Sequence, residues 1–521
     1  MQDNPGRLRA ALLAGVALAL VTGGIAQARE SNEERIARLE AALAELQGEL
    51  RALKADTAAR AEVRPSAPPA PAAPSAAPAP ATLATTVSLK NGRPTLASGD
   101  GQFTASFRGL MQLDGAIHDQ DDAGPLASDF RRGSFGDATE NERARDMADG
   151  FNFRRIRLGI EGKAFGDFQY NFTYDFGGSG NEEGGKVNAA WLQYNGLGVA
   201  RLRVGAYAPT TSLEDGASNA SALFAERAAV AEVVRGLAGG DARVGAGLYA
   251  GGERWTLSGT VTGNIAGVQT YDEQLGFVGR ATFVPYQQDD TLIHLGLAAN
   301  VIINPAATGP DIPGGAPSPI RLRERPEIRV DSARLVDTGS IDSDGVTALG
   351  LEFGARRKNL YLQAEYFDIA VERRASALPD PDFSGWYVQG SWILTGESRA
   401  YNAATAGFDG PKVAKVFSPG DGNWGAWELG VRYSILDLNY RENDLPALGS
   451  IRGGEQEILS VGLNWYLNPG VAMQFTWRNV QVDRTSPGGT AFGAGAFATP
   501  ILGTDVGQDL NIYSVRTQYA F

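Results

Sequence analysis

The sequence predicts an all-β membrane protein, a 16-stranded antiparallel transmembrane β-barrel with a short N-terminal coiled-coil helix. Three observations favour this fold class: a secretory leader, sixteen later segments in which apolar and polar residues alternate, and an aromatic residue that ends the last segment. Alternation with a period of two places one set of side chains on each face of a strand, as in bacterial outer-membrane barrels. From Gln102 onward, no stretch is apolar and continuous enough to predict a membrane-spanning helix.

The composition of the 521 residues excludes several classes of protein. The chain has no cysteine, which excludes disulfide scaffolds, thiolate zinc sites and cysteine nucleophiles. Its two histidines, His118 and His294, are too few for a multi-histidine metal site, and we predict neither a metal nor another cofactor. The formal net charge of −13 disfavours nucleic acid as a partner.

Residues 1–28 are predicted to be a signal peptide. Arg7 and Arg9 form a basic start, a mostly apolar run extends from Ala10 to Ala26, and a small-x-small pattern precedes the expected cleavage after Ala28. A retained membrane anchor is the alternative, but an anchor needs about 20 apolar residues and this run is shorter and interrupted by glycine. We therefore expect the mature protein to work outside the cytoplasm.

Residues 29–60 are predicted to form a periplasmic coiled-coil helix, and residues 61–85 a Pro/Ala-rich linker. In the helix, apolar residues recur at the a and d positions of a heptad: Ile36, Leu39, Leu43, Leu46, Leu50 and Leu53. A helix folded against its own chain is the alternative interpretation. The linker has the composition of a semi-rigid, extended spacer. One hypothesis is that residues 29–81 connect the outer membrane to the cell wall.

The barrel is predicted over residues 100–521. In residues 168–176, for example, aromatic residues alternate with polar ones such as Asn171 and Asp175. The apolar face often carries aromatic residues at strand ends and the other face carries charges, which is typical of a membrane barrel with a polar interior. The sixteen predicted strands are 102–114, 152–162, 168–176, 187–195, 199–207, 243–251, 254–262, 275–284, 291–300, 346–355, 359–367, 384–394, 424–434, 457–467, 471–481 and 510–521.

Long and short connections alternate along this barrel, for example 115–151 followed by 163–167. Long extracellular loops and short periplasmic turns produce this rhythm in outer-membrane barrels. The connection 395–423 is an exception, since it is long where a short turn is expected. Either this periplasmic turn is enlarged or the predicted strand register slips there.

The last predicted strand ends as the assembly signal of outer-membrane proteins does, in an aromatic residue. Tyr513, Tyr519 and the terminal Phe521 fall on the predicted lipid face, whereas Arg516 and Gln518 fall on the inner face. We assign Tyr519 and Phe521 to this assembly signal, and we expect outer-membrane lipid and the barrel assembly machinery as partners.

A sixteen-stranded barrel is wide enough for a water-filled lumen, so passive diffusion of small hydrophilic solutes is the expected function. Ten arginines point inward on the predicted register and form a candidate anion pathway: Arg108, Arg155, Arg157, Arg201, Arg203, Arg243, Arg280, Arg432, Arg478 and Arg516. Fewer acids point inward, namely Glu161, Asp175, Glu352, Glu365 and Glu428. Guanidinium groups suit phosphate and carboxylate because they donate in a bidentate fork. The alternative is that each arginine pairs with a neighbouring acid across strands.

The third long connection, residues 208–242, is expected to fold into the lumen as a constriction loop. Its charged residues are Glu214, Asp215, Glu226, Arg227 and Arg235. Composition alone leaves open whether this loop narrows the pore.

Four stretches carry a family resemblance: residues 153–177 (FRRIRLGIEGKAFGDFQYNFTYDFG), 387–401 (YVQGSWILTGESRAY), 425–433 (GAWELGVRY) and 460–469 (SVGLNWYLNP). They resemble the phosphate-selective porin O and P family of bacterial outer-membrane porins. The resemblance, which runs from about residue 100 to the end, implies a homotrimer of sixteen-stranded barrels, and some members select phosphate or polyphosphate.

The resemblance also implies a ladder of arginines in the lumen. Arg155, Arg157, Arg201 and Arg203 lie in the matching early strands. The family's Gly-Gln-Phe-Lys motif at the start of the third loop is Gly-Ala-Tyr-Ala at residues 205–208, so its lysine has no counterpart at that position.

We therefore expect an outer-membrane porin that prefers small anions such as phosphate, with its N-terminal segment in the periplasm. The alternative is a general, non-selective porin whose coil and linker also connect the outer membrane to the cell wall. A barrel enzyme such as a phospholipase would need a His–Ser pair on the lipid-facing side. His294 is predicted inward and His118 at a loop entrance, so we do not expect an enzyme.

Overall fold

The computed structural model describes Gly48 and residues 84–90, 92–120, 147–178, 185–309, 318–444, 448–486, 502–503, 505 and 507–521. The predicted signal peptide (1–28), coiled coil (29–60) and linker (61–85) lie outside the described residues, apart from Gly48, Ala84 and Thr85. Among the described residues, no helix is both long enough and apolar enough to cross a membrane.

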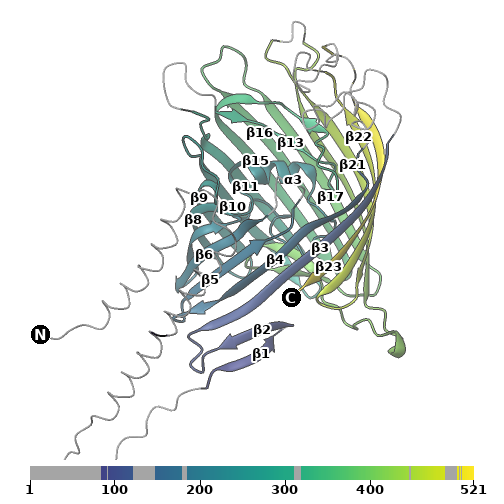
Figure 1. The fold of residues 1–521 in the computed structure, drawn as a ribbon. Helices are drawn as coiled ribbons and strands as arrows, with labels where there is room; N and C mark the ends of the chain where they lie inside the picture. Colours follow the sequence, from purple (N-terminus) through teal and green to yellow (C-terminus); the bar gives the residue numbers. More distant parts are fainter. Residues whose placement is uncertain are drawn as a thin grey trace, which may run out of the picture. The chain divides into compact units, whose positions relative to one another are not determined.

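Sixteen antiparallel strands form a closed barrel, because the last strand pairs with the first along the register Leu510↔Gln120 to Ala520↔Leu110 (Figure 1). The barrel strands are β3 (Thr104–Gln120), β4 (Gly150–Ala164), β5 (Phe168–Asp175), β6 (Lys186–Leu197), β7 (Ala200–Tyr207), β8 (Arg243–Gly251), β9 (Trp255–Ile265), β10 (Leu275–Gln288), β11 (Thr291–Asn304), β15 (Ile341–Arg357), β16 (Leu360–Arg373), β17 (Asp382–Ile393), β20 (Ala426–Tyr440), β21 (Ile451–Tyr466), β22 (Val471–Asp483) and β23 (Gln508–Ala520). The predicted strand count and strand order are confirmed.

The two faces of these strands are as the alternation predicts. On β22, Phe475 points outward and is 41% exposed, whereas Arg478 points inward and is fully buried. On β5, Phe172 is 51% exposed, whereas its neighbour Asn171 is buried. Apolar side chains outside and polar side chains inside are what a lipid-facing barrel with a hydrated lumen requires.

The seam of the barrel is closed by the C-terminal residue. The backbone N–H of Phe521 donates to the carbonyl of Gly109 at 3.0 Å, and Gly109 N–H donates to the Phe521 carbonyl at 3.0 Å. The Phe521 ring lies directly over Gly109, where a Cβ atom would be 2.3 Å from the ring. Tyr519, one pleat earlier, faces outward and is 45% exposed.

A hairpin that the sequence did not predict precedes the barrel. Strands β1 (Thr86–Lys90) and β2 (Arg93–Ala97) pair with each other, and β2 also pairs with the start of β3. In Figure 1 the hairpin lies below the lower end of β3.

The third long connection packs inside the barrel and carries the helix α3 (Ala229–Ala238), which Figure 1 shows between the walls. Eight of the ten helix residues are buried. Inward-facing glycines make room for the helix: a Cβ at Gly385 would lie 2.7 Å from Val230, and one at Gly276 would lie 2.6 Å from Ala238. A helix therefore fills part of the lumen.

The exceptional connection after β17 is an enlarged periplasmic turn, and the strand register does not slip. It contains a second hairpin, β18 (Arg399–Asn402) and β19 (Gly407–Pro411), and the short helix η4 (Pro419–Asp421). The hairpin enters the lumen, because Phe408 packs against the inward-facing Tyr361 with ring centroids 5.0 Å apart. The long loop before β15 also forms short strands: β12 (Pro319–Ile320), β13 (Arg323–Glu324) and β14 (Val336–Asp337).

Candidate anion pathway in the barrel lumen

Two wall arginines, one on β23 and one on β20, hold the inserted segments. Arg516 donates from Nε and Nη2 to the two carboxylate oxygens of Asp114, both at 2.6 Å, and from Nη2 to Glu226 at 3.0 Å. Arg432 donates to Glu327 at 2.9 Å and also pairs with Glu214. A third wall arginine, Arg478, donates to the hydroxyl of Ser514 on β23 at 2.7 Å and so contacts the wall itself. All three guanidinium groups are buried.

Glu226 in the third loop is the centre of this anchoring. Its carboxylate accepts hydrogen bonds from Arg154 at 2.8 Å, Arg155 at 3.4 Å and Arg516 at 3.0 Å, and it lies 3.7 Å from Arg329. Burial acts to raise the pKa of Glu226, but the charges of the surrounding guanidinium groups outweigh it and hold this pKa well below the usual range.

Helix α3 is capped at its N-terminus by carboxylates from outside the helix. The first N–H groups have no partner within any helix, and here Ala228 N–H donates to Glu214 at 3.0 Å and Ala229 N–H to Glu327 at 3.1 Å. Negative charge at this end also interacts favourably with the positive, N-terminal end of the helix dipole.

At the other end, Arg243 donates to the carbonyls of Gly239 at 2.8 Å and of Gly236 and Leu237 at 3.2 Å. Charges at both ends therefore fix the helix in the lumen.

The remaining acids of the third loop pair within the loop and with β4. Asp215 lies 2.7 Å from Arg235 and 3.0 Å from Arg227. Asp241 accepts from Arg157 at 2.7 Å and also pairs with Arg235. Burial acts to raise the pKa of Asp241, but the adjacent arginines hold it well below the usual range. Four of the five predicted constriction residues thus belong to one ion-pair network, whereas Glu214 pairs separately with Arg432.

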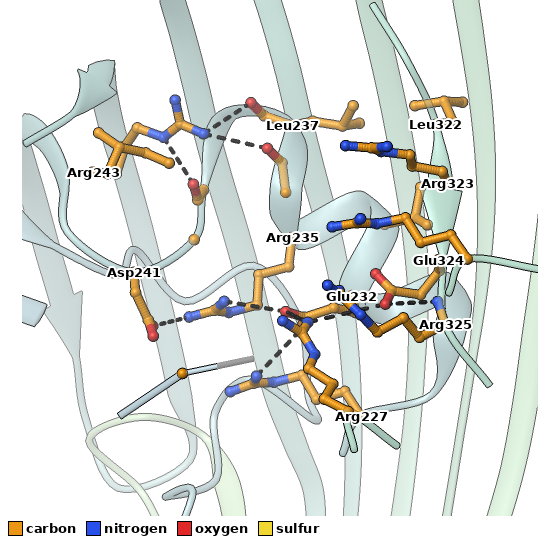
Figure 2. A pocket seen from close by; sticks show the side chains of 18 of the residues that line it. Arg227, Glu232, Arg235, Leu237, Asp241, Arg243, Leu322, Arg323, Glu324 and Arg325 are labelled. Atoms are coloured by element: carbon orange, nitrogen blue, oxygen red, sulfur yellow. Dashed lines mark hydrogen bonds and ion pairs between the residues drawn. The ribbon is translucent and has the colours of Figure 1, made fainter. Parts of the chain in front are cut away.

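Much of this network lines a basic pocket with a volume of about 430 Å³. Its wall holds twelve basic side chains, namely Lys186 and Arg154, Arg155, Arg157, Arg227, Arg235, Arg243, Arg321, Arg323, Arg325, Arg329 and Arg334. Only four acids line it: Asp175, Glu232, Asp241 and Glu324. Figure 2 shows Arg323 and Arg325 reaching in from one side and Arg235 and Arg243 lying on the other. The excess of positive charge makes the pocket attractive to anions.

The five arginines between residues 321 and 334 were not predicted to lie in the lumen, because 208–242 was the one connection expected to turn inward. Their signal in the sequence is the density of arginine in RLRERPEIRVDSAR, residues 321–334. Lys186 was also expected in a connection, but it begins β6 and lines the pocket. The arginines were missed because strand periodicity does not show which loops turn inward, and Lys186 was missed because the predicted strand began one residue later, at 187.

On the β6–β8 wall, Arg201 and Arg203 lie apart from the ion-pair network. The Arg203 guanidinium stacks over the Trp191 ring at 4.3 Å and lies 5.3 and 5.1 Å from the rings of Tyr207 and Tyr249. Within the described part of the chain, neither arginine has a carboxylate partner. Their positive charge is therefore not neutralised by a direct contact there.

Three more predicted lumenal arginines pair with acids on the wall, as Arg516 does with Asp114. Arg108 lies 2.8 Å from Glu161 across the β3–β4 pair, and Arg157 lies 2.6 Å from Asp175 across β4–β5. Arg280 forms a bidentate pair with Glu352, with both contacts at 2.8 Å. The alternative prediction, that lumenal arginines pair with acids on neighbouring strands, therefore holds for some of the ten predicted lumenal arginines.

Both histidines are buried within the barrel. His294 is buried, 2.9 Å from the Tyr401 hydroxyl of the lumenal hairpin and 3.1 Å from Glu352. The Arg280 guanidinium donates to the hairpin carbonyls of Thr405 at 2.7 Å and Ala406 at 2.9 Å. His294 therefore helps to hold the hairpin, and His118 lies buried near the extracellular end of β3.

A closed sixteen-stranded barrel with apolar outer faces and a charged lumen defines a channel of the outer-membrane porin class. A family model described as "Phosphate-selective porin O and P" matches residues 130–521, and the chain belongs to this family. The family and the fold indicate a channel in the outer membrane.

Two curated relatives are similar over most of their length. An uncharacterized protein of Caulobacter vibrioides is 28% identical over 485 residues, which cover 87% of this chain and 86% of the relative. Porin O of Pseudomonas aeruginosa is 25% identical over 377 residues, which cover 69% of this chain and 82% of the relative. Among solved structures, the anion-selective porin from Comamonas acidovorans is 12% identical, with a TM-score of 0.45 over 80% of this chain and all of that chain.

Proposed function

We propose that this porin prefers anions, and that the basic pocket and the arginines of the lumen form their path. The observation that carries the proposal is the charge of the pocket wall, with twelve basic and four acidic side chains around one cavity. An anion entering from outside meets this positive potential before the third loop narrows the lumen. Local potential of one sign raises the concentration of the opposite ion and its entry rate.

The finer proposal is selectivity for phosphate or polyphosphate. Eleven of the twelve basic groups in the pocket are arginines, whose planar forks match the oxygens of phosphate bidentately. The family description and the similarity to Porin O support this reading. Arg201 and Arg203 would continue the path on the far side of the third loop.

The test is the reversal potential of the purified protein in a planar bilayer under a KCl gradient, followed by addition of phosphate. We expect anion selectivity and a chloride current that phosphate blocks. Arg203→Gln should lower the ratio of anion to cation permeability, whereas Arg203→Lys, which keeps the charge, should preserve most of it. Cation selectivity in the unmodified protein would overturn the proposal.

A general, non-selective porin is the second candidate. It is favoured by the ion pairs around Glu226 and Arg432, which neutralise several wall arginines directly. Equal permeability to potassium and chloride, with no block by phosphate, would support this candidate instead.

We also propose that the protein is a homotrimer, with the β5–β8 wall facing another protomer. Three of the four strands of this wall are short, since β5 and β7 have 8 residues each and β8 has 9, whereas β6 has 12. At about 3.3 Å per residue and a tilt of about 45°, eight residues rise only about 19 Å, less than the apolar band of about 25 Å. A short wall is better covered by protein than by lipid. Cross-linking from cysteine introduced at Leu202, outward on β7, would test this.

The N-terminal segment carries a separate proposal, which rests on sequence alone. We propose that residues 29–81 connect the barrel to the cell wall. Deletion of these residues should leave conductance unchanged and reduce co-purification of the porin with peptidoglycan. Unchanged co-purification would contradict the connection.

A further inference from the structure

The enlarged periplasmic connection continues beyond its lumenal hairpin and crosses the rim of the barrel. After β19, Val413 packs against Ala426, Tyr466 and Ala472, which are buried on the inner side of the wall. Four residues later, Phe417 N–H donates to the Leu467 carbonyl at 2.7 Å. The chain therefore passes from the lumen to the periplasmic end of β21 and its turn.

On the outer side, this segment joins an aromatic cluster. The Phe417 ring lies 5.2 Å from Trp465 and 5.8 Å from Trp424. Trp465 stacks on Trp427 with centroids 5.0 Å apart, and its indole N–H donates to the Trp424 carbonyl at 2.7 Å.

Trp427 and Trp465 are outward residues at the periplasmic ends of β20 and β21. Aromatic rings at this level form the girdle where a barrel meets the membrane interface. Phe417 and Trp424 therefore extend the girdle beyond the strands.

The surface of the segment is amphipathic. Trp424 is 58% exposed and Val416 is 50% exposed, although both are apolar and lie beside the lipid-facing wall. Lys412 and Lys415 are exposed on the same segment, as is Asp421, which accepts from the Ser418 hydroxyl at 2.6 Å. Exposed apolar groups with flanking lysines are typical of segments that lie in a membrane interface.

The neighbouring wall is long enough to face lipid. Strand β20 has 15 residues and β21 has 16, above the roughly 9–11 residues that a tilted strand needs to cross a bilayer. The outward residues Leu429 and Val431 continue the apolar surface above the cluster and are 38% and 45% exposed. The surface of the segment is therefore continuous with the lipid-facing belt.

From this continuity we infer that residues 411–424, the rim platform, bind phospholipid of the periplasmic leaflet. Trp424 and Val416 pack against the glycerol and upper acyl region of the lipid, while Lys412 and Lys415 contact its phosphate. The platform thereby fixes the outer end of the segment whose inner end forms the lumenal hairpin.

The absence of cysteine from the sequence allows a direct test. Val416→Cys in the full chain is labelled with bimane and reconstituted into phosphatidylcholine vesicles, with or without a lipid that carries a nitroxide near the top of its acyl chain. We expect quenching comparable to that of Leu429→Cys on the lipid-facing wall and several-fold stronger than that of Lys358→Cys in another periplasmic turn. Quenching no stronger than at Lys358→Cys would overturn the inference and favour a periplasmic protein as the occupant.

The lysine contacts are tested separately by native mass spectrometry with phosphatidylglycerol. The double variant Lys412→Gln, Lys415→Gln should retain fewer lipids than the unmodified protein, and Lys358→Gln should retain as many. Equal retention by all three would overturn the phosphate contact. Current recordings on the same samples show whether the barrel conducts, so failure of the platform and failure of the porin function are distinguishable.

Discussion

At the scale of single residues, the lumen is organised by carboxylates that each face several guanidinium groups. Glu226 contacts Arg154, Arg155 and Arg516, and Arg329 lies close by. In a buried setting such a carboxylate compensates charges that would otherwise be left without a counterion. Glu226 therefore stabilises the third loop as a whole and not one contact alone.

Glu226→Gln should loosen the third loop while the barrel stays folded. Removing one partner of a buried ion pair typically costs about 3–5 kcal/mol, because the opposite charge stays buried without compensation. We expect single-channel currents with more frequent fluctuations between conductance levels. Glu253→Gln, at an exposed periplasmic turn, is the matched control. Equally quiet currents in both variants would contradict the anchoring role.

At the scale of elements, helix α3 and the β18–β19 hairpin enter the lumen from opposite ends and are held by polar contacts to the wall. The hairpin is fixed by Arg399, which donates to both oxygens of Glu428 at 2.7 and 3.0 Å. The third loop is fixed on β16, where Glu365 accepts from the backbone N–H groups of Leu213 at 2.7 Å and Glu214 at 3.1 Å. The width of the channel is thus set by inserted elements.

The ion pairs of Glu226, Glu232 and Asp241 with their arginines should persist under acid conditions. Burial acts to raise the pKa of Glu232, but Arg235 and other nearby arginines lower it to about 2, and the pKa values of Glu226 and Asp241 also lie well below the usual range. A lowered pKa in the folded state gives stability above the unfolded carboxylate pKa, and this stability is lost as pH falls through the folded value. Single-channel conductance should therefore stay constant from pH 7 to about pH 4. A step change within that range would refute this expectation.

Removing the lumenal hairpin should widen the channel. Replacement of residues 399–411 by a short glycine-serine turn leaves all sixteen barrel strands in place. We expect a higher single-channel conductance and weaker selectivity, because solutes then pass farther from the charged walls. Heat-dependent migration on SDS gels checks that the barrel is folded. A folded variant with unchanged conductance would indicate that the hairpin lies outside the solute path.

At the scale of the whole molecule, the net charge and the charge of the pathway have opposite signs. The chain carries a formal charge of −13, yet twelve basic and four acidic side chains line the basic pocket. Overall charge therefore does not predict which ions the pore attracts. What counts is the distribution of charge around the lumen.

This distribution makes the anion preference dependent on salt. The Debye length falls from about 10 Å at 0.1 M salt to about 3 Å at 1 M, so the field of the pocket wall reaches less of the lumen at high salt. The permeability ratio of chloride to potassium should accordingly fall toward the ratio in free solution. Reversal potentials at several mean concentrations but one fixed gradient would measure this. A ratio independent of concentration would mean that direct binding, rather than long-range attraction, sets selectivity.

The sequence already contained signs of the inserted elements. Gly354, Gly385 and Gly430 are inward-facing strand residues whose missing side chains make room for Phe408, Val230 and Leu223. A large barrel does not need glycine at these positions unless something packs against the wall. Inward glycines in predicted strands are therefore a usable signal of inserted loops, although they do not say which loop inserts.

The sequence by itself determined the strands, their order and the face that each side chain takes. This information is local, since alternation with a period of two and the demands of lipid on one face fix the position of Phe475 or Arg478 without any distant contact. Tertiary structure alone decided what fills the lumen. Glu226 and Glu327 are far in sequence from Arg516 and Arg432, and only closure of the barrel brings those charges together. The strands are encoded locally, whereas the pathway arises from long-range pairing of charges.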